Sequence, residues 1–279
     1  MRLPSNHLGF VLGLLLAFAT TAAPATEGEL RVCADPNNLP FSNSAEAGFE
    51  NRLAAMMAEH FGQQVSYTWW AQRRGFIRNT LKAGRCDVVM GVPSGYDLVE
   101  TTKPYYRSSY VFVTRQDQHL ELSSLLDPRL HHLVIGVHLI GDDGNNPPPA
   151  QVLGDQGIVD NVRGYSIYGD YRQPDPPARL IEAVESGSLD VAAAWGPLGG
   201  YFAQRSPVPL TVTPIRDYER FAPQQFQFAI AMGVRKGDDA LRDRLNAFID
   251  EHRSEITSLL RSYGVPLVDQ PVAVSGGHE

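Results

Sequence analysis

The sequence has 279 residues, and its 24 Lys and Arg against 31 Asp and Glu give a formal net charge of −7. This acidic balance removes the electrostatic basis for binding nucleic acid or anionic lipid, so neither partner is expected. Two cysteines are too few for a four-ligand structural zinc site, and no other residue pattern predicts a resident metal or cofactor.

The first residues carry the pattern of an export signal. Arg2 precedes an apolar run over residues 8–19, and small residues that include Ala23 and Ala25 follow it. The apolar run is too short for a permanent transmembrane helix, which needs about 20 residues. Residues 1–25 are therefore predicted to be a signal peptide cleaved near Ala25, which leaves a soluble periplasmic protein without membrane insertion.

The first half of the mature chain alternates short apolar runs with amphipathic helical patterns. Strands are predicted at residues 30–34, 65–70 and 87–90, and helices at residues 49–61 and 75–83. In the first helix Phe49, Leu53 and Met56 fall on one stripe, and Gly62 is placed to end it. This βαβαβ order is typical of a mostly parallel sheet with helices on both faces.

The two cysteines, Cys33 and Cys86, belong to this first half. In an oxidising compartment an isolated pair is more often bridged than reactive. A bridge between them would close a loop of about 50 residues and contribute roughly 4 kcal/mol on the chain-entropy model. Two buried free thiols are the alternative.

Two stretches of the chain, residues 82–96 and 185–201, share an order of helix end, glycine, aspartate, apolar strand, and then glycine and proline. Such a pair predicts two similar sheets whose loops face each other across a cleft. The chain is expected to cross between the lobes near residues 113–115 and again near residues 214–216. The predicted organisation is lobe 1 at residues 26–115 plus 216–270, lobe 2 at residues 116–215, and a disordered tail at residues 271–279.

The last part of lobe 1 is predicted to contain a strand at residues 226–234 and two helices. Gly237 and Asp238 introduce the first of these helices, and Gly264 stops the second.

Several phrases resemble the extracellular solute-binding proteins of family 3, the amino-acid-binding group of ABC importers. They are LRVCADPNNLPFSN, GFENRLAAMMAEHFG, LKAGRCDVVMG, TKPYYRSSYVFV and AMGVRKGD. Three others, WWAQRRGFIRNTL, the stretch over residues 136–171, and AAAWGPLGGYFA, are similar to a subfamily associated with PQQ-dependent methanol or alcohol dehydrogenases, the J-type accessory proteins of methanol oxidation. The resemblance implies an α/β fold of the periplasmic binding protein type II, with two lobes whose central, mostly parallel sheets are joined by two crossover strands.

The resemblance also implies where an amino-acid ligand would be held, and this sequence departs from that pattern. The stretch at Ser94–Asp97 has no Arg for the ligand carboxylate, and Gly141-Asp142-Asp143 replaces the usual Ser or Thr at a helix N-terminus. Trp195 stands where the family has an Asp that pairs with the ligand ammonium. A free amino acid is therefore not expected as the ligand.

Where these amino-acid-binding groups are missing, the sequence has aromatic and arginine side chains. Such side chains are the usual anchors of protein interfaces. The candidate cleft residues are Asn37, Asn38, Phe41, Trp69, Trp70, Arg73, Arg74, Pro93, Tyr96, Asp142, Asp143 and Trp195. Neighbouring strand residues point to opposite faces, so at most one of Trp69 and Trp70 is expected to face the cleft. The alternatives are that Arg74, Arg78 and Lys82 form a solvated helix stripe, and that the asparagines only cap turns.

The favoured hypothesis is a non-catalytic protein that clamps a PQQ-dependent dehydrogenase, or a peptide segment of it, during maturation or activation. The second is the binding component of an ABC importer that delivers a small molecule other than a free amino acid to a permease. The third is a dehydratase-like enzyme on the same fold. The sequence has no nucleophile elbow, HExxH motif, P-loop or dinucleotide fingerprint, so no enzymatic activity is expected.

Overall fold

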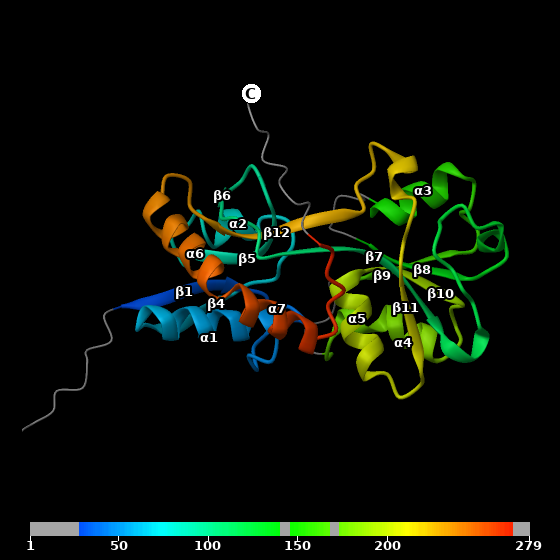
Figure 1. The fold of residues 1–279 in the computed structure, drawn as a ribbon, viewed down its shortest axis with the longest axis horizontal. Coiled ribbons are helices and arrows are strands. Elements are labelled where there is room, and N and C mark those ends of the chain that lie inside the picture. Colours follow the sequence, from blue (N-terminus) through cyan, green and yellow to red (C-terminus); the bar gives the residue numbers. More distant parts are fainter. Residues whose placement is uncertain (1–27, 140–145, 168–172, 270–279) are drawn as a thin grey trace, which may run out of the picture.

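The computed structural model describes residues 28–139, 146–167 and 173–269, which form two lobes side by side (Figure 1). Each lobe has a central sheet covered by helices, and long strands run between the lobes. The predicted signal peptide, the predicted tail, and the candidates Asp142 and Asp143 lie outside the described residues. The expected type II periplasmic binding protein fold is confirmed.

The first lobe is built on a mixed sheet. Its strand order is β4 (Gln64–Trp69), β1 (Glu29–Ala34), β5 (Val88–Pro93), β12 (Gln227–Val234) and the start of β7 (Tyr106–Arg115), with β6 (Glu100–Thr101) beside β12. The pairs β4–β1 and β1–β5 are parallel, whereas β12 runs antiparallel to its neighbours. Parallelism is thus confined to the strands that helical connections join.

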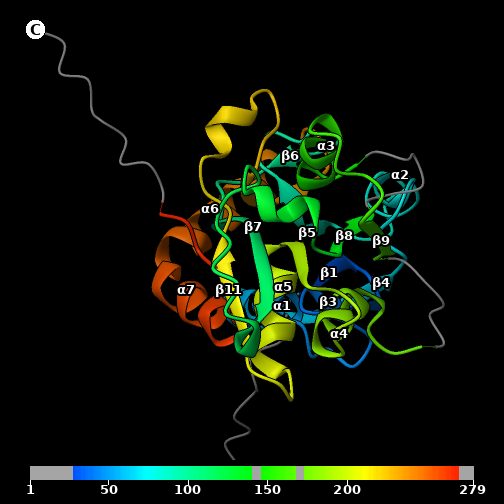
Figure 2. The ribbon, with the colours of Figure 1, turned by 90° about the vertical axis from the view of Figure 1, so that its right-hand side faces the viewer.

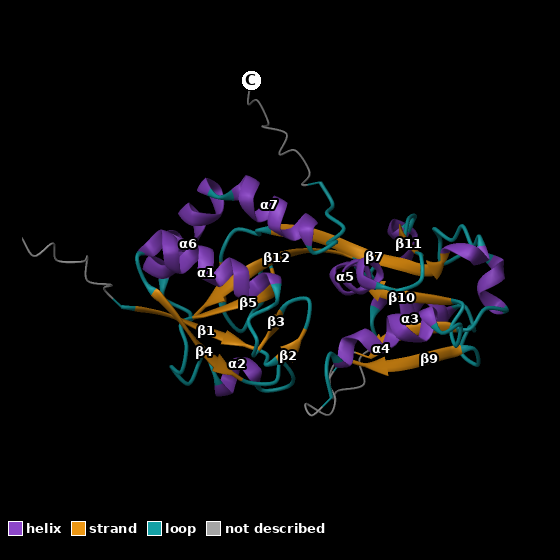
Figure 3. Ribbon diagram, turned by 90° about the horizontal axis from the view of Figure 1, so that it is seen from below, coloured by secondary structure: helices purple, strands orange, loops and turns teal. Residues whose placement is uncertain are grey.

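Helices cover both faces of this sheet (Figure 3). On one face lie α1 (Phe49–Phe61), α6 (Asp239–Glu251) and α7 (Arg253–Ser262), whose apolar stripes share a core with alternate residues of β1, β5 and β12. Gly62 ends α1 in the left-handed conformation, as predicted. The opposite face carries α2 (Phe76–Asn79).

A disulfide between Cys33 and Cys86 anchors this second face, with the two Cα atoms 5.5 Å apart. It joins β1 to the turn before β5 inside a small core with Phe76, Ile77 and Leu81. The predicted bridge is confirmed, and the alternative of two free thiols is wrong.

The helix expected at residues 75–83 is shorter than predicted: α2 begins at Phe76 and ends at Asn79. The Thr80 hydroxyl donates to the carbonyl oxygen of Phe76 at 2.7 Å, and the backbone of Thr80 leaves the helical region. Such local bonding by a β-branched hydroxyl residue competes with helix continuation. The chain from Thr80 to Gly84 forms turns instead of continuing the helix.

The second lobe repeats this plan (Figure 2). Its strands are β9 (Val162–Ser166), β8 (Ile135–Leu139) and β10 (Val191–Trp195), all parallel. The end of β7 follows and is antiparallel to β10, and β11 (Leu210–Pro214) is antiparallel to β7. On one face packs α3 (Pro148–Asp155), and on the other α4 (Arg179–Glu185) and α5 (Gly196–Arg205). The remaining short elements are η1 (Gln116–Gln118), η2 (Pro128–His131), η3 (Pro176–Ala178), η4 (Tyr218–Phe221), β2 (Asn37–Asn38) and β3 (Ser42–Asn43).

Strand β7 connects the sheets, because its first residues pair with β12 and its later residues pair with β10 from Tyr110 onward. The return path reaches β12 through Phe226, whose carbonyl oxygen accepts from the N–H of Tyr110 at 3.1 Å. Ile215 and Phe226 are both buried in the core of the second lobe. The lobe limits expected at residues 115 and 215 remain predictions, and we propose limits near residues 109 and 226 from this packing.

The two similar stretches noted in the sequence contain β5 and β10. Each of these strands pairs with a parallel strand on one side and an antiparallel crossing strand on the other. The two therefore hold equivalent places in their lobes. Within the described parts of the chain, no helix is both long and apolar enough to cross a bilayer.

Candidate functional site

A cleft of about 900 Å³ opens where β5 and β10 end. Its lining includes Pro93, the last residue of β5, and Trp195, the last residue of β10. The other described lining residues belong to the first lobe, so Trp195 is the second lobe's contribution among them. The volume lies at the upper end of the range for drug-sized ligand pockets.

Among the described lining residues the one acidic side chain is Glu50, which lies on the first turn of α1 at the floor of the cleft. Glu50 is 6% exposed, and its Oε1 accepts a hydrogen bond from the Tyr105 hydroxyl at 3.3 Å. The strand above it contributes Gly91 with φ of +74°, and a Cβ there would lie 2.5 Å from Glu50 Oε1. Glycine at this position therefore makes the room in which the carboxyl group is buried.

Burial raises the pKa of Glu50 to about 8, and the hydrogen bond from Tyr105 lowers it in part. Desolvation disfavours the charged carboxylate more than this one donor stabilises it. At neutral pH the floor of the cleft is thus mostly uncharged, with Phe41, Tyr106 and Ile230 as its apolar neighbours.

One wall of the cleft is cationic. Arg73, Arg74, Arg78 and Lys82 line it from the segment after β4 and from the chain around α2, and all four are exposed. The whole protein is acidic, so this wall is a local reversal of charge. Cations gathered beside an uncharged floor favour an anionic ligand group or an acidic partner segment.

A buried aspartate fixes the segment that leads to this wall. Asp35, at the end of β1, is 1% exposed, and its Oδ2 accepts from the N–H of Gln72 at 2.7 Å. Its Oδ1 accepts from the N–H of Asn37 at 2.8 Å. Asp35 therefore holds two loops of the first lobe together beside Arg73.

Asn37 is not among the residues that line the cleft, but it connects the two lobes by hydrogen bonds. Its Nδ2 donates to the carbonyl oxygen of Gln173 at 2.8 Å, and its Oδ1 accepts from the N–H of Asp175 at 3.2 Å. Asn38, the next residue, lines the cleft and donates to Gln72 Oε1 at 3.4 Å. The asparagine pair thus does more than cap a turn.

Trp195 lines the cleft and packs against two other aromatic rings. Its ring makes edge-to-face contacts with Tyr110 at 5.4 Å and with Phe228 at 5.7 Å between ring centroids. Such contacts restrict the orientation of the indole, which remains partly exposed. A preoriented aromatic ring that lines the same cleft as the cationic wall can stack on a flat or apolar ligand surface.

The structure brings seven of the twelve candidate residues to the cleft lining: Asn38, Phe41, Arg73, Arg74, Pro93, Tyr96 and Trp195. Trp69 stacks on Tyr67 with ring centroids 4.5 Å apart and packs against the core of the first lobe. Trp70 is 37% exposed, and the Arg85 guanidinium lies 5.6 Å from its ring centroid. Neither tryptophan is among the residues that line the cleft.

Sequence reasoning missed Glu50, Gln72 and Gly91. An acidic residue in the first turn of a helix is common for reasons of the helix dipole alone, so Glu50 gave no signal of burial. The helical spacing of Arg78 and Lys82 indicates only a solvated stripe, yet both residues line the cleft.

The chain matches the family described as bacterial extracellular solute-binding proteins, family 3, over residues 30–265. It is 34% identical over 268 residues to Protein MoxJ of Methylorubrum extorquens, a match that covers 90% of this chain and 85% of that protein. The crystal structure of periplasmic binding protein XoxJ from Methylobacterium extorquens AM1 is similar, with 33% identity and a TM-score of 0.71. MxaJ from Methlophaga aminisulfidivorans MPT has 25% identity and a TM-score of 0.72.

Both solved structures are covered over 100% of their length by 86% of this chain. These similarities confirm the family and subfamily resemblance found in the sequence phrases. The chain belongs to the bacterial extracellular solute-binding proteins of family 3.

Proposed function

We propose that this chain is a non-catalytic periplasmic protein that assists a PQQ-dependent methanol or alcohol dehydrogenase. In this proposal the cleft holds a segment of the enzyme during its maturation or activation. Similarity to the J-type proteins MoxJ, XoxJ and MxaJ supports the choice of partner. The signal-like residues 1–25, with cleavage near Ala25, support the compartment.

The observation that carries the proposal is the chemistry of the cleft lining. A free amino acid needs an anion for its ammonium and a fitted donor set for its carboxylate. Among the described lining residues Glu50 is the one acid, and burial keeps it protonated at neutral pH. A large cleft with a mostly uncharged floor and a cationic wall instead suits a bulky segment that has both apolar and acidic side chains.

The competing importer function is supported by the family itself, whose description is that of solute-binding proteins. It requires a small molecule that is not a free amino acid, delivered to an ABC permease. A flat, anionic compound would satisfy the same wall and the Trp195 ring. The two functions therefore differ in the size of the occupant.

The test measures binding of the mature chain to the purified dehydrogenase by calorimetry, beside a panel of small anionic and apolar compounds. The double variant Arg73→Glu with Arg78→Glu reverses two charges of the wall. Its control, Arg52→Glu with Arg261→Glu, makes the same charge change at two exposed arginines that do not line the cleft. We expect the wall variant to bind the enzyme at least about tenfold more weakly, whereas the control binds as the unmodified chain does.

Equal affinities in the two double variants would place the enzyme contact outside the cleft. A tight small ligand, combined with no affinity for the dehydrogenase, would refute the clamp and support the importer function.

A further inference from the structure

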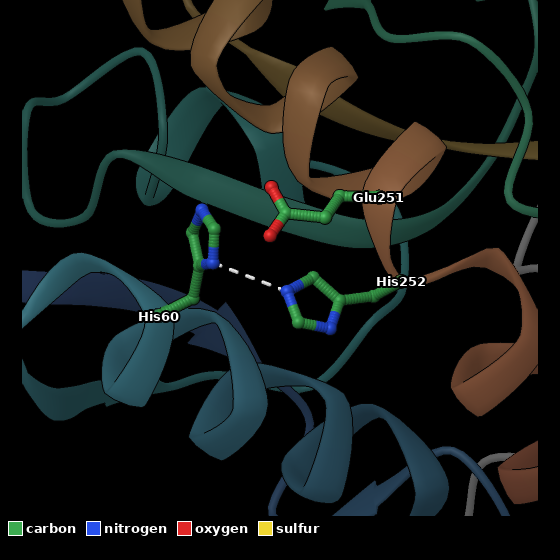
Figure 4. A group of neighbouring side chains, drawn as sticks. All are labelled: His60, Glu251 and His252. Carbon is green, nitrogen blue, oxygen red and sulfur yellow. Dashed lines mark hydrogen bonds between the residues drawn. The ribbon is translucent and has the colours of Figure 1, made fainter.

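Two histidines that are far apart in the sequence face each other on the surface of the first lobe (Figure 4). His60 lies in the last turn of α1, and His252 lies between α6 and α7. His60 Nδ1 and His252 Nε2 are 3.1 Å apart across a sequence separation of 192 residues. The Glu251 carboxylate points toward the same gap, and one ligand atom from each of the three residues lies within 4.8 Å of the others.

The spacing of the two nitrogens suits a shared metal ion. Zinc binds imidazole nitrogen at about 2.0–2.1 Å, so a tetrahedral angle separates two such nitrogens by about 3.3 Å. The observed 3.1 Å is close to that separation. Glu251 is exposed, so its side chain can rotate to supply a carboxylate oxygen as the third ligand.

A second carboxylate orients one of the rings. His252 Nδ1 lies 2.6 Å from Glu255 Oε2, and a carboxylate there accepts a hydrogen bond from the ring N–H. In the neutral ring the lone pair then lies on Nε2, the atom that faces His60. A carboxylate behind a histidine is the usual arrangement around metal-bound imidazole, because it fixes the tautomer and increases the basicity of the ligating nitrogen.

Aromatic packing holds the rings in place before any ligand arrives. His252 stacks on Phe248 with ring centroids 4.6 Å apart, and His60 makes an edge contact with the same ring at 5.4 Å. Without a metal, the contact between the two imidazoles requires one proton, carried by His60 Nδ1 and accepted by His252 Nε2. A metal ion can replace that proton, because His60 is exposed and can carry its proton on Nε2 toward water.

We propose that His60, His252 and Glu251 form a binding site for a divalent transition metal that prefers imidazole, such as Zn²⁺, with Glu255 as the supporting carboxylate. The three protein ligands leave a fourth position for water. None of the three lines the cleft, so this site is independent of the proposed function. The ion would join the end of α1 to the junction of α6 and α7.

The test is a zinc titration of the untagged mature chain, by calorimetry and by competition with a chromophoric chelator. We expect one Zn²⁺ per chain, with an affinity that falls at least about tenfold in His60→Ala and in His252→Ala. Glu255→Gln should weaken binding about tenfold while it leaves all three ligands in place. The control His131→Ala with His132→Ala removes two exposed imidazoles of the second lobe and should bind as the unmodified chain does.

Cobalt supplies a second readout, because Co²⁺ in a four-coordinate site absorbs visible light more strongly than hydrated Co²⁺. Loss of this absorption in His60→Ala, with unchanged thermal unfolding of the metal-free variant, would assign the ion to this site. The proposal is overturned if the unmodified chain takes up no stoichiometric zinc. It is equally overturned if the variant lacking both His60 and His252 binds zinc as well as the control does.

Discussion

The buried carboxyl group of Glu50 makes the stability of the protein depend on pH in a direction opposite to that of most acidic side chains. Its pKa is raised to about 8 by burial, whereas in the unfolded chain it returns to its ordinary value of 4.5. Between these two values the folded state keeps a proton that the unfolded state has released. The stabilising contribution is therefore fully present below pH 4.5 and is lost as the pH rises through 8.

The magnitude follows from the difference in pKa between the two states. Each unit is worth about 1.4 kcal/mol, so the full loss approaches about 5 kcal/mol when the pH passes 8. Most of this loss has occurred by pH 7, and about 1 kcal/mol remains to be lost between pH 7 and pH 9. Glu50→Gln keeps the shape of the side chain and an oxygen that can accept from Tyr105, but it has no proton to release.

The assay is urea unfolding at several values between pH 6 and pH 9. We expect the unmodified chain to lose about 1 kcal/mol more than Glu50→Gln between pH 7 and pH 9, and the variant to be the more stable of the two at pH 9. Glu59→Gln, an exposed change on the same helix, controls for loss of a charge. Parallel stability curves for Glu50→Gln and the unmodified chain would refute the burial argument.

Three further predictions concern packing, the disulfide and acid stability. Gly200→Ala should destabilise the chain by several kcal/mol in thermal unfolding, because the added Cβ would lie 1.9 Å from the carbonyl oxygen of Gly264. Its control is Gly154→Ala, which has open space around it and should be neutral or stabilise the chain by up to about 1 kcal/mol. Replacing Cys33 and Cys86 with serine should remove about 4 kcal/mol of stability in urea, and an unchanged midpoint would contradict the chain-entropy account. Burial lowers the pKa of His138 from 6.5 to about 4, so between these values the unfolded chain binds a proton that the folded chain does not. The free energy of unfolding should therefore fall by about 3 kcal/mol as the pH drops from 6.5 toward 4, and this loss should be absent in His138→Gln.

The two proposed sites use different residues and should bind their ligands independently. In the proposed function the cleft would bind through the wall around Arg73 and the ring of Trp195, whereas the histidine pair lies on the surface of the first lobe. Zinc bound at His60 should therefore leave affinity for the dehydrogenase unchanged. Calorimetry with and without zinc can check this independence.

Local patterns in the sequence were sufficient to predict α1, with its apolar stripe and its end at Gly62. They also predicted the disulfide, because compartment and cysteine number left few alternatives. The two similar stretches predicted strands that end at one cleft, and Pro93 and Trp195 do line it. Each of these properties belongs to a contiguous segment or to overall composition, so it can be read without knowledge of the fold.

Elements from elsewhere in the chain determined whether individual polar and aromatic side chains are buried and which residues they contact. Glu50 is buried because Gly91 on another strand leaves space above it, and Trp69 is directed into the core rather than the cleft. His60 meets His252 only because α1 and α6 pack side by side on one sheet. Periodicity therefore predicted most strands and helices of the first lobe, and the two similar stretches predicted the two-lobed plan. The charge and the contacts of the side chains in the two sites came from tertiary packing. The burial of a side chain and its distance from a partner depend on segments far away in the sequence, and a local sequence pattern carries no information about them.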